Sequence, residues 1–255
     1  MTALADIPAL ILAGGAGTRL RSVVSDRPKS MARVAGRPFL ELQIGWLARQ
    51  GVRNVVLCTG YLHEHVLAHF GDGRALGVHI EYSVEGSPLG TGGALKLAES
   101  LAGRGPFLAL NGDSFLDADL AGLVCAHAAH RATLASCVGT LVLCTVPDAR
   151  EFGSVQIDAR RRVVRFDEKS EAQAGPALVN AGVYCLEPAL LELVAPGRNV
   201  SLERETFPLA LSKHLALFGQ PVEGGFVDIG TPRGYERMCR QLEQQLEQQL
   251  EQRKE

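Results

Sequence analysis

The first hundred residues alternate short runs of aliphatic and β-branched residues with amphipathic stretches of helical period. Apolar runs of strand length occupy residues 8–13, 53–59 and 78–84. Between them, residues 38–50 and 63–70 carry apolar positions at helical spacing. A strand, a helix and a second strand in succession favour parallel pairing, because the connection has to cross back over the sheet. The alternation therefore predicts an α/β fold whose parallel sheet has helices on both faces.

The polar residues that follow two of the predicted strands are the first candidates for a binding site. Gly14 follows the first strand, and residues 106–114 are predicted to form a central strand that ends in a polar turn, which contains Asp113. A further helix is predicted to begin near Thr91. Ligands of open α/β sheets bind outside the carboxyl ends of the strands. We therefore expect Gly14 and Asp113 to face the same ligand.

The second part of the chain has shorter strands. They are predicted within residues 152–186, and the chain then returns through a strand that ends at Asp228, with Thr231 and Pro232 suited to begin a last helix. We expect one domain over residues 1–240. This domain comprises a first half at 1–147, a smaller ligand-binding half at 148–225, and a return strand and helix at 226–240, and a helical tail at 241–255 follows it.

Composition excludes several classes of function. The chain has 255 residues, 46% of them hydrophobic, and a formal net charge of −2, which gives no electrostatic reason to expect nucleic acid or an anionic membrane as partner. Its first residues lack a basic segment and include Asp6, and no apolar run has the length that a bilayer requires. Six cysteines show no metal-ligand spacing. We expect a cytoplasmic protein with reduced thiols.

The loop after the first strand suggests a phosphate site. Gly14, Gly15 and Gly17 allow sharp turns and close approach of backbone N–H groups, Arg19 can bind two phosphate oxygens, and Lys29 supplies a point charge. The loop matches neither the dinucleotide-binding fingerprint nor the P-loop. The glycines alone are equally compatible with a structural turn. The two basic residues shift the interpretation towards polyphosphate.

Two aspartates at strand ends, Asp113 and Asp228, suggest a magnesium site. Mg²⁺ binds one or two carboxylates together with phosphate oxygens and water. Either aspartate alone is better explained as the cap of a turn or helix. Both together, beside a basic glycine-rich loop, favour the metal if their strands converge.

Two further stretches have weaker signals. In Leu-Gly-Thr-Gly-Gly-Ala-Leu, the N–H groups of Thr91, Gly92 and Gly93 at a helix start could contact a base or a phosphate, or simply cap a tightly packed helix. In Phe-Asp-Glu-Lys-Ser, Glu168 could accept sugar hydroxyls and Lys169 could pair with a monophosphate. The alternative for this second stretch is a solvated strand end.

An ordered set of motifs over residues 8 to about 238 resembles the sugar-1-phosphate nucleotidylyltransferases. The motifs are LAGGAGTRL with RPKSM, GRPFLE, LGTGGAL, NGDS, FDEK, NAGVY and VDIGTP. The resemblance implies a Rossmann-like, open, mixed and largely parallel sheet, with a nucleotide-binding first half and a smaller sugar-binding half. It also implies a reaction of a nucleoside triphosphate with a sugar 1-phosphate. The chain departs from relatives at Ser30 and in the Arg run at 160–162, neither of which touches the expected chemistry.

The resemblance assigns roles to particular residues. Arg19 would hold the leaving pyrophosphate, Lys29 would steady the α-phosphate, and Asp113 and Asp228 would hold Mg²⁺. The nucleotide-binding residues would be Leu12, Ala13, Gly14, Gly15, Gly17, Thr18, Gly90, Thr91, Asn111 and Gly112. The sugar-phosphate-binding residues would be Gly153, Glu168, Lys169, Asn180 and Gly182.

Several stretches, among them GYLHEH and SLERETFP, are most similar to the branch of the family that joins GTP to D-glycero-α-D-manno-heptose 1-phosphate. Alternatives are mannose 1-phosphate with GTP, or UTP or dTTP with a 1-phosphate of the glucose or N-acetylmuramic acid type. A catalytically silent regulatory subunit that binds sugar nucleotide, and a dinucleotide-dependent oxidoreductase, are the alternatives from other classes. We expect a monomer or small homo-oligomer that binds neither nucleic acid nor membrane.

The tail gives the first testable prediction. Residues 241–252 repeat Gln-Leu-Glu-Gln three times, so its leucines recur every four residues and drift around a straight helix. A solvated helical extension is favoured over an oligomerisation seam. Removal of residues 241–255 should leave kcat and KM almost unchanged, because every motif precedes the tail. A change of mass in light scattering would instead identify the tail as an interface.

Overall fold

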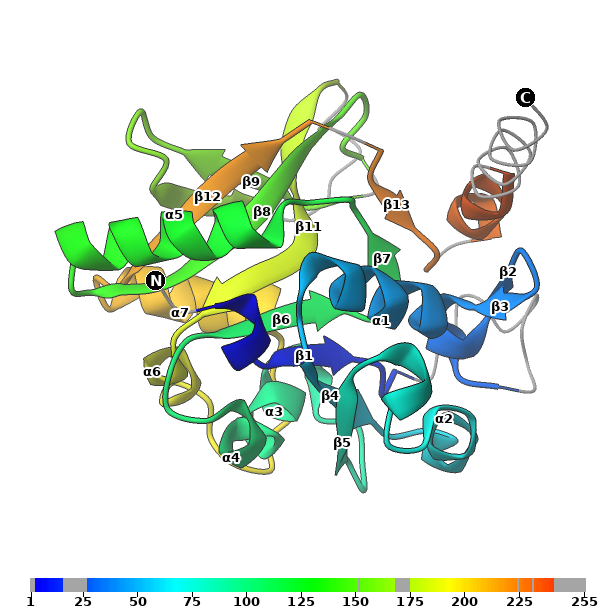
Figure 1. The fold of residues 1–255 in the computed structure, drawn as a ribbon. Coiled ribbons are helices and arrows are strands. Elements are labelled where there is room, and N and C mark those ends of the chain that lie inside the picture. The colour runs from blue at the N-terminus through cyan, green and yellow to red at the C-terminus, as the bar shows by residue number, and fades with distance from the viewer. Residues whose placement is uncertain are drawn as a thin grey trace.

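The computed structural model describes residues 3–15, 27–150, 152–167, 175–223, 225–230 and 232–240. Nine strands form one mixed sheet in the order β10-β9-β11-β6-β1-β4-β5, with β8 beside β11 and β12 beside β8 (Figure 1). The nine strands are β1 (Ala9–Leu12), β4 (Asn54–Thr59), β5 (His79–Val84), β6 (Phe107–Asn111), β8 (Cys137–Val146), β9 (Ser154–Ile157), β10 (Val163–Asp167), β11 (Ala177–Leu186) and β12 (Ala216–Val222).

Two short antiparallel pairs complete the strands. They are β2 (Arg33–Val34) with β3 (Arg37–Pro38), and β7 (Ser114–Phe115) with β13 (Val227–Asp228). The α-helices are α1 (Phe39–Gln50), α2 (His63–Phe70), α3 (Gly90–Leu97), α4 (Glu99–Ala102), α5 (Leu120–Thr133), α6 (Pro188–Leu191) and α7 (Phe207–Ser212). Short 3₁₀ turns span Leu4–Asp6, Lys29–Met31 and Arg74–Leu76, a π turn spans Leu202–Thr206, and residues 232–240 are helical.

The parallel core predicted from the alternation is confirmed. β1 pairs in parallel with both β4 and β6, and β4 pairs in parallel with β5. β11 then joins β6 in the antiparallel direction, which makes the sheet mixed. Among the described residues, the second half of the chain adds β9, β10, β11 and β12 to the sheet that β1 begins and forms no separate large sheet.

Helices cover both faces of the sheet, as the sequence predicts. Ile11 of β1 packs in a cluster with residues of α1, α2 and α5, whereas its neighbour Leu10 packs on the other face with residues of α3, α6 and α7. Successive side chains of a strand point to opposite faces, so β1 contributes to both layers. Both side chains are fully buried, and each stabilises the fold by about 2 kcal/mol through removal of apolar surface from water.

The predicted central strand ends in a polar turn, as the sequence indicates. β6 ends at Asn111 because the chain turns at Gly112, whose N–H donates to the carbonyl of Leu12 at 3.0 Å. A Cβ on Gly112 would lie 2.5 Å from that carbonyl oxygen, so the turn requires glycine. The chain resumes as β7 at Ser114, on a separate two-stranded pair. The turn thus directs Asp113 out of the sheet.

Helix boundaries follow local chemistry. α1 begins after Pro38, and Gly51, at φ +102°, ends it in the left-handed conformation that favours glycine. In the part of the chain described here, no helix is both long enough and apolar enough to cross a bilayer. The predicted cap Thr231 and the predicted tail at 241–255 lie outside the described residues.

A buried glutamine connects α1 to the turn after β6. Gln43, which is 2% exposed, donates from Nε2 to the carbonyls of Asn111 and Ser114, both at 2.9 Å. These two residues flank the turn that carries Asp113. The amide therefore holds the turn against the helix through both of its N–H bonds.

Replacement of this glutamine tests that connection. Gln43→Leu should lower the free energy of unfolding by about 1–3 kcal/mol, because buried carbonyls lose their donor. Gln50→Leu is the matched control on the same helix, since Gln50 bonds one carbonyl, that of Ala118 at 3.0 Å, and is half-buried. Urea denaturation should show a clearly smaller loss for the control. Equal losses would contradict the role given to Gln43.

Candidate active site

The carboxyl ends of three parallel strands form one edge of the sheet, and the predicted nucleotide-binding residues lie there. Leu12 of β1 is in register with Cys58 of β4 and with Asn111 of β6. Ala13 donates its N–H to the carbonyl of Cys58 at 2.8 Å, which extends the pairing by one residue. The structure thus brings Leu12, Ala13, Gly14, Gly15, Asn111 and Gly112 to one edge. Gly17, Thr18 and Arg19 lie outside the described residues.

The two predicted metal-binding aspartates lie side by side. Asp228 is in register with Ser114 across the β7–β13 pair, and the N–H of Ile229 donates to the carbonyl of Asp113 at 2.8 Å. These residues are more than a hundred positions apart in the sequence. Figure 1 shows β13 alongside β7 at the end of the sheet. The convergence that the magnesium interpretation requires is therefore present.

Lys29 pairs with Asp113 and lies next to the Gly230 turn that follows Asp228. Its Nζ lies 2.5 Å from Oδ2 of Asp113, and its side chain is 10% exposed. On the other side, Oδ1 of Asp228 accepts the N–H of Gly230 at 2.5 Å, and a Cβ on Gly230 would lie 2.6 Å from Lys29 Nζ. The ammonium group is thus enclosed between the two chain segments that carry the carboxylates.

The charges of this cluster fit a hard divalent cation. Lys29, Asp113 and Asp228 together carry one net negative charge, and the Asp113 side chain is 38% exposed, which leaves one side of its carboxylate open to a ligand. No group of three or more His, Cys, Asp or Glu side chains suited to a metal occurs among the described residues. Two carboxylates, completed by phosphate oxygens and water, match the coordination that Mg²⁺ adopts with nucleotides.

The predicted sugar-binding residues of β11 lie next to this cluster. The pairing of β11 shifts register between Asn180 and Tyr184, and within this bulge Gly182 has φ +72°. A Cβ on Gly182 would lie 2.7 Å from both Asn111 Nδ2 and Ser114 Oγ. Glycine therefore lets β11 approach the turn that carries Asp113. Gly153 lies just before β9, and Glu168 and Lys169 lie outside the described residues.

The start of α3 differs in part from expectation. The N–H groups of Gly92 and Gly93 both donate to the carbonyl of Val200, at 2.8 and 3.3 Å. A Cβ on Gly92 would lie 3.0 Å from Thr206 Oγ1. Packing against the segment before α7 thus uses these two donors, so of the two interpretations left open for Gly92 and Gly93 the structure supports the tightly packed helix start. Gly90 and Thr91 remain candidates for nucleotide binding.

Glu85, which the sequence did not single out, belongs to the same edge. It follows β5, the fourth strand of the parallel set, and its Oε2 accepts the N–H of Leu89 at 3.0 Å. Its Oε1 lies 2.7 Å from where a Cβ of Gly14 would be. Burial raises the pKa of this carboxyl group. The sequence signal that could have identified Glu85 is its position directly after a parallel strand. Glycine at position 14 leaves room for the Glu85 carboxylate.

Glu203 is a second residue that sequence reasoning did not identify. Its carboxylate accepts hydrogen bonds from Thr91 Oγ1 at 2.9 Å and from Tyr184 Oη at 3.2 Å. The motif SLERETFP was noted for its resemblance, but no periodicity distinguishes Glu203 from the neighbouring Glu205. The contact with Thr91 exists because the π turn packs against α3.

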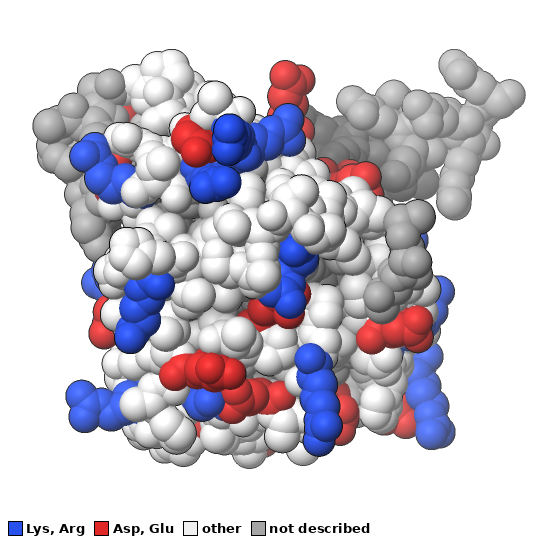
Figure 2. Space-filling model, turned by 90° about the vertical axis from the view of Figure 1, so that its left-hand side faces the viewer, with Lys and Arg blue, Asp and Glu red and all other residues white. Residues whose placement is uncertain are grey.

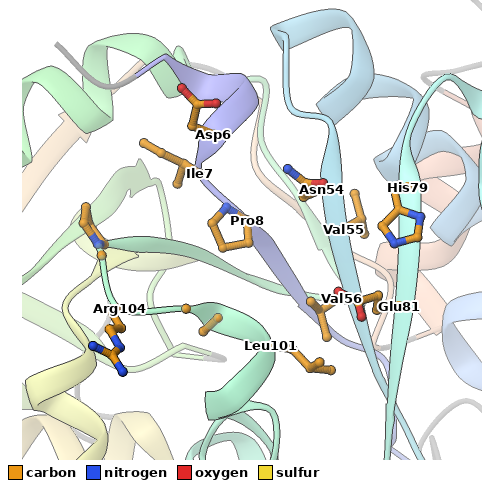
Figure 3. A pocket seen from close by; sticks show the side chains of 14 residues that line it. Asp6, Ile7, Pro8, Asn54, Val55, Val56, His79, Glu81, Leu101 and Arg104 are labelled. Carbon is orange, nitrogen blue, oxygen red and sulfur yellow. The ribbon is translucent and has the colours of Figure 1, made fainter.

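A separate cavity of about 410 cubic ångströms lies at the opposite edge of the sheet, where the parallel strands begin (Figure 3). Asp6, Asn54, His79, Glu81 and Arg104 contribute its polar side chains. Since catalysis in such folds takes place at the carboxyl edge, this cavity is distinct from the candidate active site. On the face shown in Figure 2, basic and acidic side chains are interspersed rather than gathered by sign.

Comparison with known proteins identifies the family. The model of the nucleotidyl transferase family matches residues 8–245. D-glycero-α-D-manno-heptose 1-phosphate guanylyltransferase of Aneurinibacillus thermoaerophilus is 35% identical over 92% of this chain and 98% of the relative. Mannose-1-phosphate guanylyltransferase of Mycobacterium tuberculosis is 39% identical over 93% of this chain, but this chain covers 65% of that relative, slightly less than two thirds.

A solved structure agrees with the sequence comparisons. HddC from Yersinia pseudotuberculosis, complexed with GMP-PN, superposes with a TM-score of 0.78 and 29% identity, over 92% of this chain and 99% of that chain. The residues matched by the family model, 8–245, include Lys29, Asp113 and Asp228. This chain belongs to the nucleotidyl transferase family.

Proposed function

We propose that this chain transfers the guanylyl group of GTP to D-glycero-α-D-manno-heptose 1-phosphate, giving the GDP-sugar and pyrophosphate. Membership of the nucleotidyl transferase family supports the reaction class. The observation that carries the proposal is the convergence of Lys29, Asp113 and Asp228 at the carboxyl edge of the parallel strands. A catalytically silent subunit has no need of these three groups together.

The reaction exchanges one phosphoanhydride bond for another. An oxygen of the sugar phosphate attacks the α-phosphorus of GTP, the bond to the β-phosphate breaks, and pyrophosphate leaves with its electron pair. No covalent enzyme intermediate is needed, so catalysis consists of alignment and neutralisation of charge. Lys29, whose Nζ lies 2.5 Å from Asp113 Oδ2, is proposed to steady the charge that builds on the α-phosphate. Arg19 is proposed to hold the departing pyrophosphate.

The carboxylates of Asp113 and Asp228 are proposed to hold Mg²⁺. The bound ion would supply positive charge to the phosphates, which repel both each other and the attacking oxygen. The two aspartates are held in position by the β7–β13 pair and by the N–H of Gly230. Lys29 compensates one of the two carboxylates, so the cluster is not strongly repulsive towards an incoming triphosphate.

Glu85 supports guanine as the base. Its Oε2 accepts the N–H of Leu89, which precedes the predicted base-contacting residue Gly90, and its Oε1 lies beside Gly14, another predicted base-contacting residue. The Watson–Crick edge of guanine presents the donors N1–H and N2–H, which a carboxylate can accept together. Uracil and thymine present one donor between two carbonyl oxygens, which a carboxylate repels. The guanylyltransferases of Mycobacterium tuberculosis and Aneurinibacillus thermoaerophilus to which this chain is similar agree with this preference.

The heptose is proposed from the relatives that this chain matches over almost their whole length. The Aneurinibacillus heptose enzyme is covered to 98%, and a second one from Campylobacter jejuni is 35% identical and covered to 96%. Asn180 and Glu168 are proposed to contact sugar hydroxyls. A site that hydrogen-bonds the additional hydroxyl of a heptose discriminates against mannose, because its polar groups would otherwise stay unpaired.

A pyrophosphate-release screen tests the proposal. GTP, UTP, dTTP, CTP and ATP are crossed with the 1-phosphates of D-glycero-α-D-manno-heptose, mannose and glucose. We expect the highest kcat/KM with GTP and the heptose. Preference for mannose would transfer the assignment to mannose-1-phosphate guanylyl transfer. Preference for UTP or dTTP with glucose would contradict the proposed base and sugar, and inactivity with every pair would contradict the reaction itself.

Removal of either metal-binding carboxylate tests the catalytic assignment. Asp113→Ala and Asp228→Ala should each lower kcat at least about a hundredfold, which corresponds to about 2.7 kcal/mol of barrier. Both residues lie at strand ends outside the buried core, so circular dichroism should remain that of the unchanged protein. Asp72→Ala, which removes an exposed carboxylate paired with Arg74, serves as control. Turnover near the original level in either test variant would refute this assignment.

The role of Glu85 is tested by amide substitution. Glu85→Gln should lower kcat/KM for GTP about ten- to a hundredfold, since an amide can accept one guanine donor but not both. The ratio of kcat/KM for GTP to kcat/KM for UTP should therefore decrease. Glu81→Gln changes an exposed carboxylate of the same strand and is the matched control. An unchanged ratio of GTP to UTP in the Glu85 variant would exclude contact with the base.

The same carboxylate predicts a pH dependence. Burial raises the pKa of Glu85, so its protonation begins at a higher pH than for an ordinary glutamate. Guanine binding needs the ionised form. The KM for GTP should therefore rise as the pH falls through this raised pKa, and it should recover above it. The Glu85→Gln protein should lack this rise, which steady-state kinetics between about pH 4.5 and 8 would measure.

A further inference from the structure

Three hydroxyl groups converge on the carboxylate of Glu203: that of the neighbouring Ser201, and those of Thr91 and Tyr184 from other elements of the fold. Its Oε2 accepts from Thr91 Oγ1 at 2.9 Å and from Ser201 Oγ at 3.0 Å. Its Oε1 accepts from Tyr184 Oη at 3.2 Å. Thr91 lies at the start of α3 and Tyr184 lies in β11, so one side chain connects the nucleotide side of the site with the sugar side.

The direction of each hydrogen bond on the sugar side follows from a backbone donor. The N–H of Gly182 can only donate, and it lies 2.9 Å from Asn180 Oδ1. The amide nitrogen of Asn180 therefore faces Tyr184 Oη, at 2.7 Å, and donates to it. Since the tyrosine oxygen accepts this bond, its own proton is directed at Glu203.

On the nucleotide side, the hydrogen bonds also run from a backbone N–H towards Glu203. The N–H of Leu202 donates to Thr91 Oγ1 at 2.8 Å, so the hydroxyl proton of Thr91 is likewise directed at Glu203. Two chains of hydrogen bonds, each fixed by a backbone N–H, thus end on opposite oxygens of one group. A carboxylate accepts on both oxygens, whereas an amide presents N–H groups at one of them.

Burial makes this network rigid. Tyr184 is fully buried, and its ring packs edge-on against Phe207 with 5.5 Å between the ring centroids. Burial, followed by the nearby charge of Glu203, raises the pKa of Tyr184 well above its ordinary value, so the hydroxyl keeps its proton at neutral pH. The tyrosine therefore remains a donor to Glu203.

We propose that Glu203 is a positioning residue that fixes Thr91 and Asn180 in one relative orientation and thereby aligns the nucleotide with the sugar phosphate. This inference rests on the proposed function, in which Thr91 contacts the nucleotide and Asn180 contacts the sugar. Glu203 itself touches neither reactant in this role. Its effect is on alignment, to which the rate of an in-line displacement is sensitive.

Kinetics of two variants test the connection. Glu203→Gln disturbs both chains, and it should lower kcat about tenfold or more and raise both KM values about three- to tenfold. Tyr184→Phe removes the hydroxyl on the sugar side alone, so KM should rise for the sugar 1-phosphate and stay within about twofold for GTP. A purely structural role would lower stability without this split. Equal changes of both KM values in Tyr184→Phe, or unchanged kinetics in Glu203→Gln, would overturn the proposal.

Glu205→Gln is the matched control. Glu205 lies on the same turn, and its Oε1 accepts one bond, from the N–H of Ser201 at 2.9 Å, which the amide oxygen of glutamine can also accept. Its kinetic constants should remain those of the unchanged enzyme. The double variant Glu203→Gln with Tyr184→Phe should lose less than the sum of the single losses, because both act through one network.

A measurement without substrate separates this inference from the proposed function. In ¹H–¹⁵N spectra, the side-chain amide signals of Asn180, assigned with Asn180→Ser, should shift in Glu203→Gln and Tyr184→Phe but not in Glu205→Gln. Constant signals in the two test variants would overturn the network. Shifted signals in a protein that turns over no pair of substrates would retain the positioning and reject the proposed reaction.

Discussion

The close approach of the turn after β6 to the end of β1 is the constraint on which the site depends. The N–H of Gly112 bonds the carbonyl of Leu12, and no side chain larger than hydrogen fits between the two segments. This contact ends β6 and directs Asp113 out of the sheet, towards Lys29. β13 then pairs with β7 and brings Asp228 to the same place. The remaining groups of the site are arranged around this turn.

Buried polar side chains hold the turn and its surroundings in position. Gln43 bonds the backbone on either side of Asp113, and Gly182 lets β11 come within contact distance of Asn111. Glu203 connects β11 with α3 in the same way. These groups have their hydrogen bonds directed by backbone N–H and carbonyl groups, which do not rotate freely. Such support keeps charged groups in place without requiring them to be buried themselves.

Fold class and part of the site could be predicted from residue order. Apolar runs with period two and helices with period 3.6 lead to the parallel core, because both periods record which side chains are removed from water. Gly14, Lys29, Asp113 and Asp228 could be singled out since their positions follow strands or accompany a loop with unusual chemistry. The polar turn after β6 was predictable from its residues, but its close contact with Leu12 was not, because that contact depends on the neighbouring strand β1.

The sequence by itself determined the alternation of strands and helices, the family motifs and the residue types that phosphate and metal chemistry require. The tertiary structure decided which of them meet. Sequence distance contains no information on whether Asp228 lies beside Asp113, since that depends on the pairing of β13 with β7. The same holds for Glu85 and Glu203, whose roles arise from contacts with Gly14 and Thr91. Local patterns record burial and backbone preference, whereas long-range hydrogen bonds form only once the sheet has brought distant segments together.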